Sequence, residues 1–492
     1  MYALGASSKT MPPRSLGSVA TCAIAAASCV TAAAAAAAPS PLSANSTLLA
    51  YLHDDKTIFG SASVSLLGAE PQLLFSGWVY DTYAASLRPG SNATAWNVDV
   101  DKVLKYSTLH VDASATGRST GVNSLVFWNE KPAGIDGTCA IIGFNSASAP
   151  DLSGRAPGTW RTNISRVGDC LNVNDGATPF HWQAISPDGA TAAGWFFDSD
   201  TNVTIVALDA QTGAERWRYV DPAPANPNDR DGWISYGVTI SADGRWVVFN
   251  SGVVGFTVQY LWVLSTADGS LRDVVVSPGA LQPRLSADGG LICASTNPSS
   301  GDGGFAVLQW SASAGSYQPA GAGKAPLAPM SPEGWRLVHS AVSTDTRSGA
   351  TYLGLAWIDD SIVGPTLVAI FDAADVAKGP LNWFANERVP GSDYAVDAVT
   401  LECADYLCVA GAWAQKQDGD QPTVIVVSGR APSATAPPVL AFASRGSISA
   451  VSIVRAPGGA GAPCFVGAAG CSTVGSCIAP GGDAYLWRIE GQ

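Results

Sequence analysis

The stretch of sequence that decides the fold reads Ala207-Leu208-Asp209-Ala210-Gln211-Thr212-Gly213-Ala214-Glu215-Arg216-Trp217. It continues an alternating run, residues 203–208, that is typical of a β-strand. Polar side chains that can hydrogen-bond the local backbone, followed by a glycine that can adopt a left-handed conformation, predict a turn into a further strand. The tryptophan in that strand is large enough to fill the space between two sheets. The structural repeat motif is therefore predicted to consist of Ala207, Asp209, Thr212, Gly213 and Trp217.

Short turns of a second kind recur along the chain. Each is an apolar residue followed by Ser-x-Asp-Gly, at residues 185–189, 240–244 and 285–289, and a degenerate copy begins at Val342. Asp-Gly supplies the positive φ angles of a tight hairpin, so each copy is expected to join two antiparallel strands. The copies recur at a period of about 45 to 57 residues, which indicates a repeat architecture.

A small residue followed by tryptophan recurs in the strands after these turns, at residues 77–78, 194–195, 356–357 and 412–413. Small residues let neighbouring sheets approach, and the ring fills the space between them, as radial sheets packed face to face require. We therefore predict an all-β fold, a single β-propeller of four-stranded blades, with eight blades favoured and seven as the alternative. The predicted blades are residues 47–105, 106–168, 170–222, 230–277, 280–322, 333–388, 393–445 and 446–490.

The last predicted blade contains only three strands. An apolar N-terminal segment, residues 48–52, is expected to supply the fourth strand and close the ring, which would cover both open edges. The composition agrees with many short strands joined by turns, because only 14% of residues are charged and the chain has 52 Gly and 31 Pro. No long helix is expected after the first forty residues, and residues 372–376 form one short turn at most.

The motif at residues 207–217 resembles the AxDxxTGxxxW tryptophan-docking repeat of the pyrroloquinoline-quinone (PQQ) propellers, the quinoprotein alcohol dehydrogenase-like superfamily. The resemblance implies that the turn joins the third and fourth strands of a blade and that Trp217 docks on the next blade. A degenerate copy at residues 264–270 lacks the tryptophan, and the Ser-Pro-Asp-Gly turn suits WD40-like propellers equally well. Catalytic members of the superfamily hold the quinone against a disulfide of adjacent cysteines and bind Ca²⁺. This chain has no adjacent cysteines, so we carry over the fold and expect no cofactor.

The N-terminal segment predicts export from the cell. Lys9 and Arg14 precede an apolar run at residues 19–38, and Ala36-Ala37-Ala38 satisfies the small-residue rule for signal peptidase. A transmembrane anchor is the alternative, although a run made mostly of Ala with Ser and Thr is weak for stable spanning. We predict a secreted protein without membrane insertion of the mature chain, divided into a signal peptide (1–38), a short linker (39–46) and the propeller (47–490).

Eight cysteines follow the predicted signal peptide, and an even number in an exported chain indicates disulfides. The close pairs Cys403/Cys408 and Cys471/Cys477 are placed to bridge hairpins, and Cys139/Cys170 is a further candidate. Cys293 and Cys464 are interpreted as buried thiols in strands. No metal site is predicted, because CxxC and CxxH spacings are absent. Glycosylation sequons lie at Asn45, Asn92, Asn163 and Asn202.

The charge of the chain limits its partners. The net charge is −13 and no long Lys/Arg cluster is present, which disfavours nucleic acid and anionic membrane surfaces. Acidic clusters at residues 198–200, 228–232 and 418–420 are interpreted as solvated turn tips, not Ca²⁺ sites. We expect the mature chain to be a monomer.

Neither an HExxH pattern nor a P-loop pattern occurs in the sequence. His181, just before a repeat, is the one histidine expected to face the central channel. The favoured hypothesis is a non-catalytic propeller that binds a protein or glycan partner on one rim. The alternative is a secreted enzyme, a hydrolase or a quinoprotein-like oxidoreductase, whose acidic residues meet at the central channel. The polar side chains that line this channel separate the two hypotheses.

Overall fold

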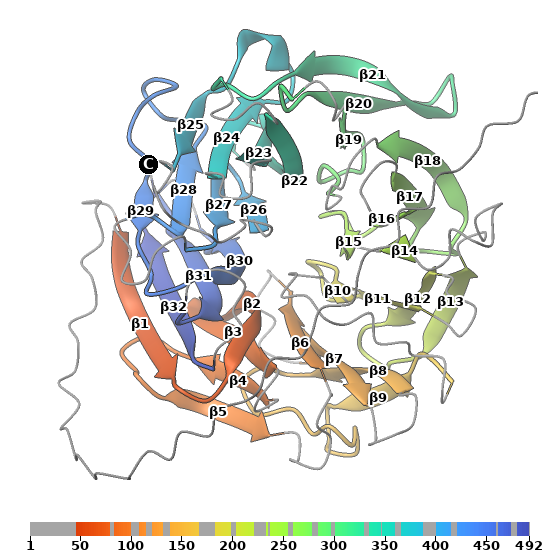
Figure 1. Cartoon of the computed structure of the whole chain (residues 1–492). Helices are drawn as coiled ribbons and strands as arrows, with labels where there is room; N and C mark the ends of the chain where they lie inside the picture. Colours follow the sequence, from red (N-terminus) through yellow and green to blue (C-terminus); the bar gives the residue numbers. More distant parts are fainter. Residues whose placement is uncertain are drawn as a thin grey trace, which may run out of the picture. The chain divides into compact units, whose positions relative to one another are not determined.

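The computed structural model describes residues 46–78, 83–99, 108–114, 121–130, 138–166, 183–197, 203–220, 233–234, 237–253, 259–277, 284–296, 301–328, 334–345, 347–359, 366–386, 400–414, 421–458, 461–473 and 480–491. The chain divides after Ala38 into two units, and all of these residues belong to the second. They form eight antiparallel sheets around a central axis, an eight-bladed β-propeller (Figure 1). The predicted all-β propeller is confirmed, and the seven-bladed alternative is wrong.

In each blade the strand order runs outward from the axis (Figure 1). Blade 1 consists of β2 (Ile58–Leu67), β3 (Glu70–Trp78), β4 (Tyr83–Leu87) and β5 (Thr94–Asp99), and blade 2 of β6 (Thr108–Ala113), β7 (Ser124–Glu130), β8 (Thr138–Phe144) and β9 (Trp160–Asn163). Blade 3 consists of β10 (Gln183–Ile185), β11 (Thr191–Phe197), β12 (Val203–Asp209) and β13 (Glu215–Val220). Blade 4 consists of β14 (Trp233–Ile234), β15 (Val238–Ile240), β16 (Trp246–Val253), β17 (Gln259–Ser265) and β18 (Leu271–Ser277).

Blade 5 consists of β19 (Leu291–Ser295), β20 (Phe305–Ser311) and β21 (Ser316–Gly323). Blade 6 consists of β22 (Trp335–Thr344), β23 (Thr351–Asp359), β24 (Thr366–Asp372) and β25 (Asn382–Ala385), with the 3-10 turn η3 (Val376–Lys378) before β25. Blade 7 consists of β26 (Thr400–Ala404), β27 (Leu407–Gly411), β28 (Val424–Ser428) and β29 (Leu440–Phe442). Blade 8 consists of β30 (Ile448–Arg455), β31 (Cys464–Cys471), β32 (Gly482–Ile489) and the N-terminal β1 (Ser46–Asp54).

The ring is closed by β1, which pairs antiparallel with β32 as the outermost strand of blade 8. The pairing covers an edge of β32 that would otherwise expose unpaired backbone groups. Tyr51 and His53 of β1 strengthen the seam, because their side chains lie 3.0 Å and 2.9 Å from Oδ1 of the buried Asp483 in β32. The predicted closure is confirmed. The predicted first blade (47–105) is wrong at its start, since blade 1 begins at Ile58.

The motif of blade 3 forms the predicted turn between β12 and β13. Oδ1 of Asp209 accepts hydrogen bonds from the backbone N–H of Gln211 (3.0 Å) and from both the N–H (3.0 Å) and the hydroxyl (3.1 Å) of Thr212. Gly213 has φ +73°, which favours glycine, and a Cβ there would lie 2.5 Å from the ring of Trp160. Blade 3 therefore receives a tryptophan from blade 2 at the same turn.

Three tryptophans in outermost strands dock on the following blade in the same way. The indole N–H of Trp217 donates to the carbonyl of Thr266 in blade 4 at 2.9 Å, as the resemblance implied. Trp160 donates to Ala210 (3.0 Å), and Trp96 of blade 1 donates to the carbonyl of Ser146 in blade 2 (3.0 Å). Trp96 and Trp160 were not predicted, because the turn residues that receive them do not repeat the Asp-x-x-Thr-Gly pattern in every blade.

Blade 4 lacks a docking tryptophan, with Asp273 at the register position that Trp217 holds in blade 3, and the neighbouring Arg272 joins blade 4 to blade 5. Its guanidinium lies 3.9 Å from the ring of Trp246 in blade 4 and 4.1 Å from the ring of Trp310 in blade 5. Its Nη1 donates to the carbonyl of Gly289 at 2.8 Å. A cation held between two aromatic faces is attracted to both, so a charged residue joins these two blades.

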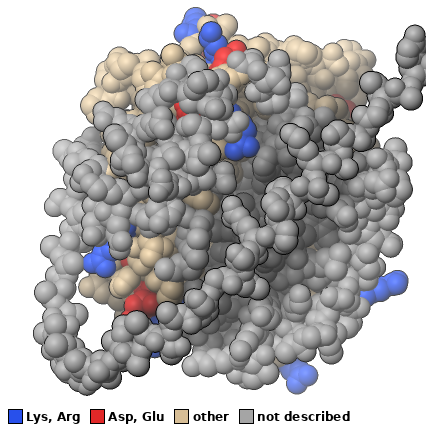
Figure 2. All heavy atoms as spheres, viewed as in Figure 1, with Lys and Arg blue, Asp and Glu red and all other residues tan. Residues whose placement is uncertain are grey.

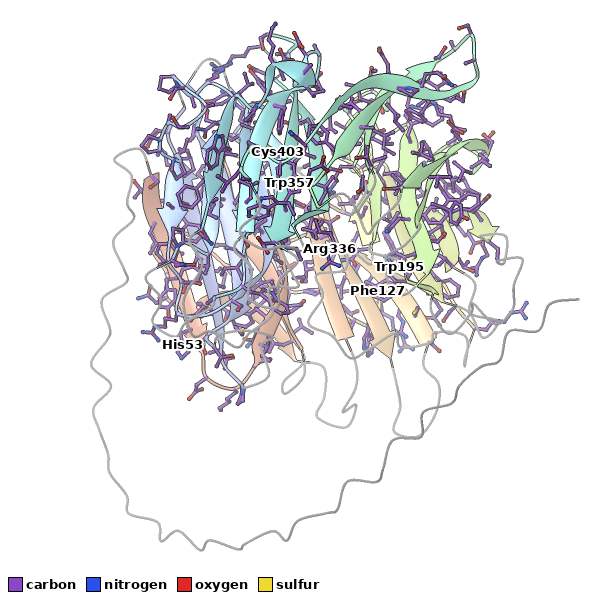
Figure 3. The ribbon with its side chains drawn as sticks, turned by 45° about the horizontal axis from the view of Figure 1, so that its top comes forward. His53, Phe127, Trp195, Arg336, Trp357 and Cys403 are labelled. Atoms are coloured by element: carbon purple, nitrogen blue, oxygen red, sulfur yellow. A yellow bond between two sulfur atoms is a disulfide. The ribbon has the colours of Figure 1, made fainter. Side chains whose placement is uncertain are left out.

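The hydrophobic core consists of layers between adjacent blades. Phe127 of blade 2 and Trp195 of blade 3 belong to one such layer, and Trp357 of blade 6 belongs to another, where its indole N–H donates to the carbonyl of Gly303 (2.8 Å) in blade 5 (Figure 3). Their side chains are at most 1% exposed. Within the described ranges, no helix has the length and apolar character needed to cross a lipid bilayer.

Candidate functional site

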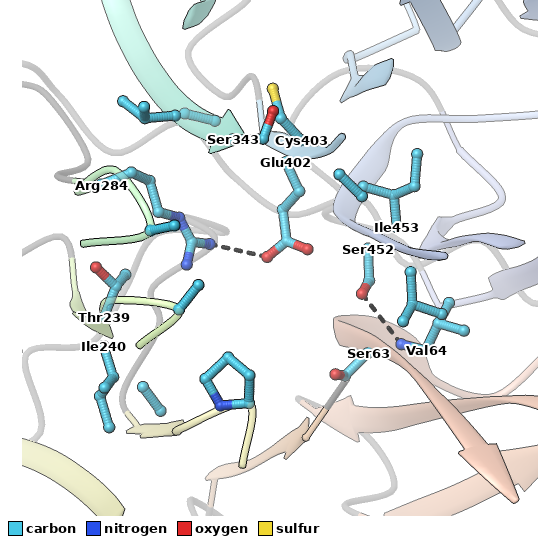
Figure 4. Close-up of a pocket in the computed structure, with 18 of the residues that line it drawn as sticks. Ser63, Val64, Thr239, Ile240, Arg284, Ser343, Glu402, Cys403, Ser452 and Ile453 are labelled. Carbon is cyan, nitrogen blue, oxygen red and sulfur yellow. Dashed lines mark hydrogen bonds and ion pairs between the residues drawn. The ribbon is translucent and has the colours of Figure 1, made fainter. Parts of the chain in front are cut away.

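The central channel holds a cavity of about 440 Å³ lined by all eight blades (Figure 4). Each blade contributes one residue at a corresponding place, two positions before the Ser of the Ser-x-Asp-Gly turn where that turn is present. We call this place the ring position, and from blade 1 to blade 8 it is occupied by Ser63, Asp112, Ala184, Thr239, Arg284, Ala341, Glu402 and Ser452.

Innermost strands have no neighbouring strand on the channel side, so their backbone N–H groups need other acceptors. Side chains at the ring position supply them. The hydroxyl of Ser452 in blade 8 accepts the N–H of Val64 in blade 1 at 3.1 Å, and the hydroxyl of Ser63 accepts the N–H of Ala113 in blade 2 at 3.0 Å. Each ring-position acceptor therefore ties its blade to the next one.

Asp112 makes the same kind of tie with a carboxylate. Its Oδ2 accepts the N–H of Ile185 in blade 3 at 3.1 Å, while Oδ1 accepts the N–H of Ala113 (2.8 Å) and the hydroxyl of Ser63 (3.2 Å). Burial, with a smaller contribution from the charge of Glu402, raises the pKa of Asp112 to about 6. One carboxylate thus joins three blades and titrates near neutral pH.

Glu402 of blade 7 is paired with Arg284 of blade 5. Its Oε1 accepts from Nη2 of Arg284 at 2.8 Å (Figure 4). The carboxylate also accepts from the N–H of Ile453 and the hydroxyl of Ser452 in blade 8. Burial raises the pKa of Glu402, although Arg284 and the two other donors act in the opposite direction. The Arg284–Glu402 ion pair joins blade 5 to blade 7. Blade 6, which lies between them, carries the small Ala341 at the ring position and so leaves room for the two side chains.

Arg284 comes from the most irregular part of the ring. It precedes Leu285, whose isolated bridge to Ile292 stands where the other blades have a regular innermost strand. The buried His339 of blade 6 is influenced by this arginine, because burial first and the charge of Arg284 second lower its pKa to about 3. His339 is therefore neutral near pH 7.

Sequence reasoning missed the three charged residues at the ring position. Asp112 lies in β6 and Glu402 in β26, and Arg284 comes directly before the apolar residue of a Ser-x-Asp-Gly repeat. Aligning the repeats on that turn would have placed Arg284 at the ring position. The predicted channel residue His181 and the acidic clusters at 198–200, 228–232 and 418–420 lie outside the described residues.

The predicted cysteine assignments are largely supported. Cys403 and Cys408 form a disulfide across the β26–β27 hairpin, next to Glu402 at the channel (Figure 3). Cys139 and Cys471 are disulfide-bonded, while Cys170 and Cys477 lie outside the described residues, so their pairing stays a prediction. Cys293 and Cys464 are buried free thiols, as interpreted from the sequence, and burial raises the pKa of Cys464 to about 12.

Two of the predicted glycosylation sites lie on described surface. Asn92 is exposed between β4 and β5, and Asn163 is exposed at the end of β9, where its Oδ1 accepts from Nε of Arg161 at 3.2 Å. Asn45 and Asn202 lie outside the described residues. Glycosylation therefore stays a prediction for all four.

The donor set of the channel does not fit a quinone with calcium. Cys403 and Cys408 are not adjacent in sequence, so they cannot form the disulfide of neighbouring cysteines that the superfamily uses. The lining residues that the structure describes include no aromatic and no amide side chain. Nor do the described His, Cys, Asp and Glu residues gather in a group of three or more that could hold a metal ion.

Comparison with known proteins agrees with the fold. No protein-family model matches the chain, and no curated protein matches it in sequence. The Dos1 propeller has a TM-score of 0.52 at 11% identity, covering 91% of this chain and 96% of that chain. Sqt1 of Saccharomyces cerevisiae has a TM-score of 0.53 at 12% identity, covering 92% and 100%. At these identities the likeness shows the fold alone.

A quinohemoprotein alcohol dehydrogenase from Comamonas testosteroni is also similar, with a TM-score of 0.49 at 11% identity, covering 91% of this chain and 77% of that chain.

Proposed function

We propose that the protein is a secreted, non-catalytic β-propeller that binds a protein or glycan partner through the turns of one rim. The observation that carries this proposal is the use of the channel acids. The carboxylate oxygens of Asp112 and Glu402 accept hydrogen bonds from backbone N–H groups, hydroxyls and one guanidinium of the blades around them. A general base or a nucleophile needs a free lone pair aimed at a substrate, and these carboxylates are occupied as ties between blades.

Export is part of the same proposal. The disulfide at Cys403 and Cys408 and the bonded Cys139 and Cys471 support an oxidising compartment. On the face shown in Figure 2, the described Lys and Arg side chains stand at separate points, not in one continuous patch. The net charge of −13 supports a protein or glycan partner over a nucleic acid, because a phosphate backbone needs concentrated positive charge.

The test uses the purified secreted protein against a glycan array and, after chemical cross-linking, against a secreted fraction from its source. Each candidate partner is then purified, and its Kd is measured for the wild type and for the Asp112→Asn and Glu402→Gln variants. We expect both variants to melt at lower temperature and to bind the partner with unchanged Kd. A partner whose Kd depends on either acid, or the absence of any partner, would overturn the proposal.

A hydrolase is the second candidate, and one observation favours it. The pKa of Asp112, about 6, suits a general acid, and the side chain lies at a cavity. A screen of glycoside and ester substrates decides between the two. We expect no turnover by the wild type. Turnover that is abolished by Asp112→Asn in a folded protein would establish the enzyme.

A further inference from the structure

We propose that the central channel is a separate binding site, which holds a small monocarboxylate with a short aliphatic body against the guanidinium of Arg284. The cavity of about 440 Å³ has the volume of small-molecule sites in proteins. It lies on the axis of the ring, so it can be filled whether or not a partner occupies the rim.

The guanidinium of Arg284 has unused hydrogen-bond donors. Nη2 donates to Glu402 at 2.8 Å, and this is the one hydrogen bond of the arginine side chain within the described part of the chain. Its other nitrogens are not sealed from solvent, since none is among the buried polar atoms without a partner. A planar fork of free N–H groups fits the two oxygens of a carboxylate.

The channel carboxylates, in contrast, are already supplied with donors. Oδ1 and Oδ2 of Asp112 receive three hydrogen bonds from three blades, and Glu402 receives two besides that of Arg284. A bound amine or metal cation would have to displace these donors and break ties between blades. The channel therefore favours a ligand that accepts hydrogen bonds over one that donates them.

The ring is divided into two halves of different character. Blades 3 to 6 carry Ala184, Thr239, Arg284 and Ala341 at the ring position, so this half has one positive charge and no acid. The walls beside it are apolar, formed by Ile185, Ile240 and Val342. A carboxylate on Arg284 would thus lie among small side chains with its aliphatic body against apolar walls, and a doubly charged anion would meet the acids Asp112, Glu402 and Asp405 across the lumen.

Binding of an anion is expected to strengthen as the pH falls. The charged or titratable groups around Asp112 are Glu402 and Arg284, and the neutral His339 lies near Arg284. Asp405 also lines the cavity, where its carboxylate is paired with Arg455. Because the pKa of Asp112 is about 6, protonation below that pH removes one negative charge from the lumen. The charges of Arg284 and Glu402 then cancel each other, so the ligand carboxylate is repelled less.

Isothermal titration calorimetry with hexanoate tests the proposal, with hexanamide and hexylamine as neutral and cationic probes of the same length. We expect hexanoate to bind the wild type roughly tenfold more tightly at about pH 5.5 than at about pH 7.5, while the other two probes give no binding heat. Arg284→Met should weaken hexanoate binding at least about tenfold. Arg245→Met is the matched control, because Arg245 is exposed and pairs with Asp243 at a surface turn.

Two more variants keep the test decisive if Arg284→Met does not fold. Arg284→Lys keeps the positive charge but lacks the planar pair of N–H donors of the guanidinium, so it should bind hexanoate several-fold more weakly. Glu402→Gln releases Arg284 from its partner and should bind hexanoate more tightly at about pH 7.5. Absence of hexanoate binding by the folded wild type, equal affinity in Arg284→Met, or preference for hexylamine would overturn the proposal. Rim binding is measured separately and does not depend on these results.

Discussion

Trp217 illustrates how a single residue joins two blades. Its ring is 9% exposed, it rests against Gly269 of blade 4, and its indole N–H donates to the carbonyl of Thr266 at 2.9 Å. A Cβ at position 269 would lie 2.8 Å from the ring, so that glycine is needed for the close approach as well as for its φ of +71°. Burial of the ring and the hydrogen bond act together at one contact.

We expect Trp217→Ala to lower the free energy of unfolding by about 3–5 kcal/mol, because it leaves a cavity between blades 3 and 4. Trp217→Phe keeps most of the ring and should cost about 1–2 kcal/mol for the lost hydrogen bond. Urea unfolding followed by circular dichroism measures both. Val276→Ala, at a side chain that is 57% exposed, is the control and should change stability by less than about 0.5 kcal/mol. A Trp217→Ala protein as stable as this control would contradict the docking role.

Asp112 gives a prediction about pH. Its pKa is raised to about 6 in the folded protein, above the ordinary value, so the folded state holds the proton more tightly. The resulting stability is present at low pH and is lost as the pH rises through about 6, on the order of 2 kcal/mol. We expect the stability of the wild type minus that of Asp112→Asn to fall between about pH 4 and about pH 7, measured by urea unfolding.

Asp151 is the control with the opposite sign. Hydrogen bonds from Ser153, Ala156 and Arg155 lower its pKa to about 2, so its contribution is present above the ordinary carboxyl pKa and is lost as the pH falls toward 2. The stability of the wild type minus that of Asp151→Asn should therefore rise between about pH 2 and about pH 4 and stay level above about pH 4, where the Asp112 difference falls. Parallel changes for the two residues would contradict the buried tie assigned to Asp112.

At the level of single residues, the roles of the turn residues were easier to predict from the sequence than the roles of the residues that line the channel. Asp209, Thr212 and Gly213 were predictable because their interactions are local, within one turn. Asp112 and Glu402 make their decisive contacts with Ile185 and Ile453 of a following blade, and no local pattern indicates such a contact. Burial between blades, which also sets their pKa values, is a property of the assembled ring.

Strand β1 is the element on which the closed ring depends. It lies more than 400 residues from β32 in sequence, and its pairing completes blade 8. An open ring would leave the edge of β32 unpaired and the aromatic pair Tyr51 and Tyr485, whose ring centres lie 5.0 Å apart, broken. Closure therefore combines backbone pairing with side-chain contacts at one seam.

We expect deletion of residues 1–54 to abolish cooperative unfolding and to cause aggregation, because it removes β1. Deletion of residues 1–45 leaves β1 in place and should preserve the melting temperature of the mature protein. Differential scanning calorimetry and size-exclusion chromatography of the two truncated proteins, each expressed with the same export signal, make the comparison. A monomeric 1–54 deletion with an unchanged melting temperature would show that β1 does not close the ring.

Arg272 gives a prediction for the joint between blades 4 and 5. Lysine keeps the charge but not the planar group that stacks on Trp246 and Trp310, so Arg272→Lys should destabilise the protein by about 1–3 kcal/mol. Arg245→Lys, at an arginine whose side chain is 66% exposed, should change stability by less than about 0.5 kcal/mol. Urea unfolding distinguishes the two. Equal stabilities would show that stacking contributes nothing at this joint.

The elements themselves were largely predictable, since period-two alternation marks the strands and Asp-Gly turns mark blades 3, 4 and 5. The closing strand was found because the last unit lacked a fourth strand. The start of blade 1 was predicted too early, because β1 directly precedes β2 in sequence but belongs to blade 8. The contact of Arg272 between blades 4 and 5 was not predictable, since its two aromatic partners come from different blades.

At the scale of the whole molecule, eight segments far apart in sequence meet at one ring. The ring position carries an acceptor in blades 1, 2, 7 and 8, where Ser63, Asp112, Glu402 and Ser452 each tie one blade to the next. Blades 3 and 6 carry Ala184 and Ala341 there, which cannot accept a hydrogen bond. This uneven distribution gives the channel an acid half that holds blades together and an opposite half that is open around Arg284.

Amide hydrogen exchange at Ile185 and Ile453 tests most directly whether the channel acids are ties between blades. We expect both amides to exchange slowly in the wild type, because Asp112 and Glu402 accept their hydrogen bonds. In Asp112→Ala the amide of Ile185 should exchange much faster while that of Ile453 stays protected, and Glu402→Ala should give the reverse. Fast exchange of both amides in the wild type, or protection unchanged in both variants, would contradict the assignment and return the two acids to the list of catalytic candidates.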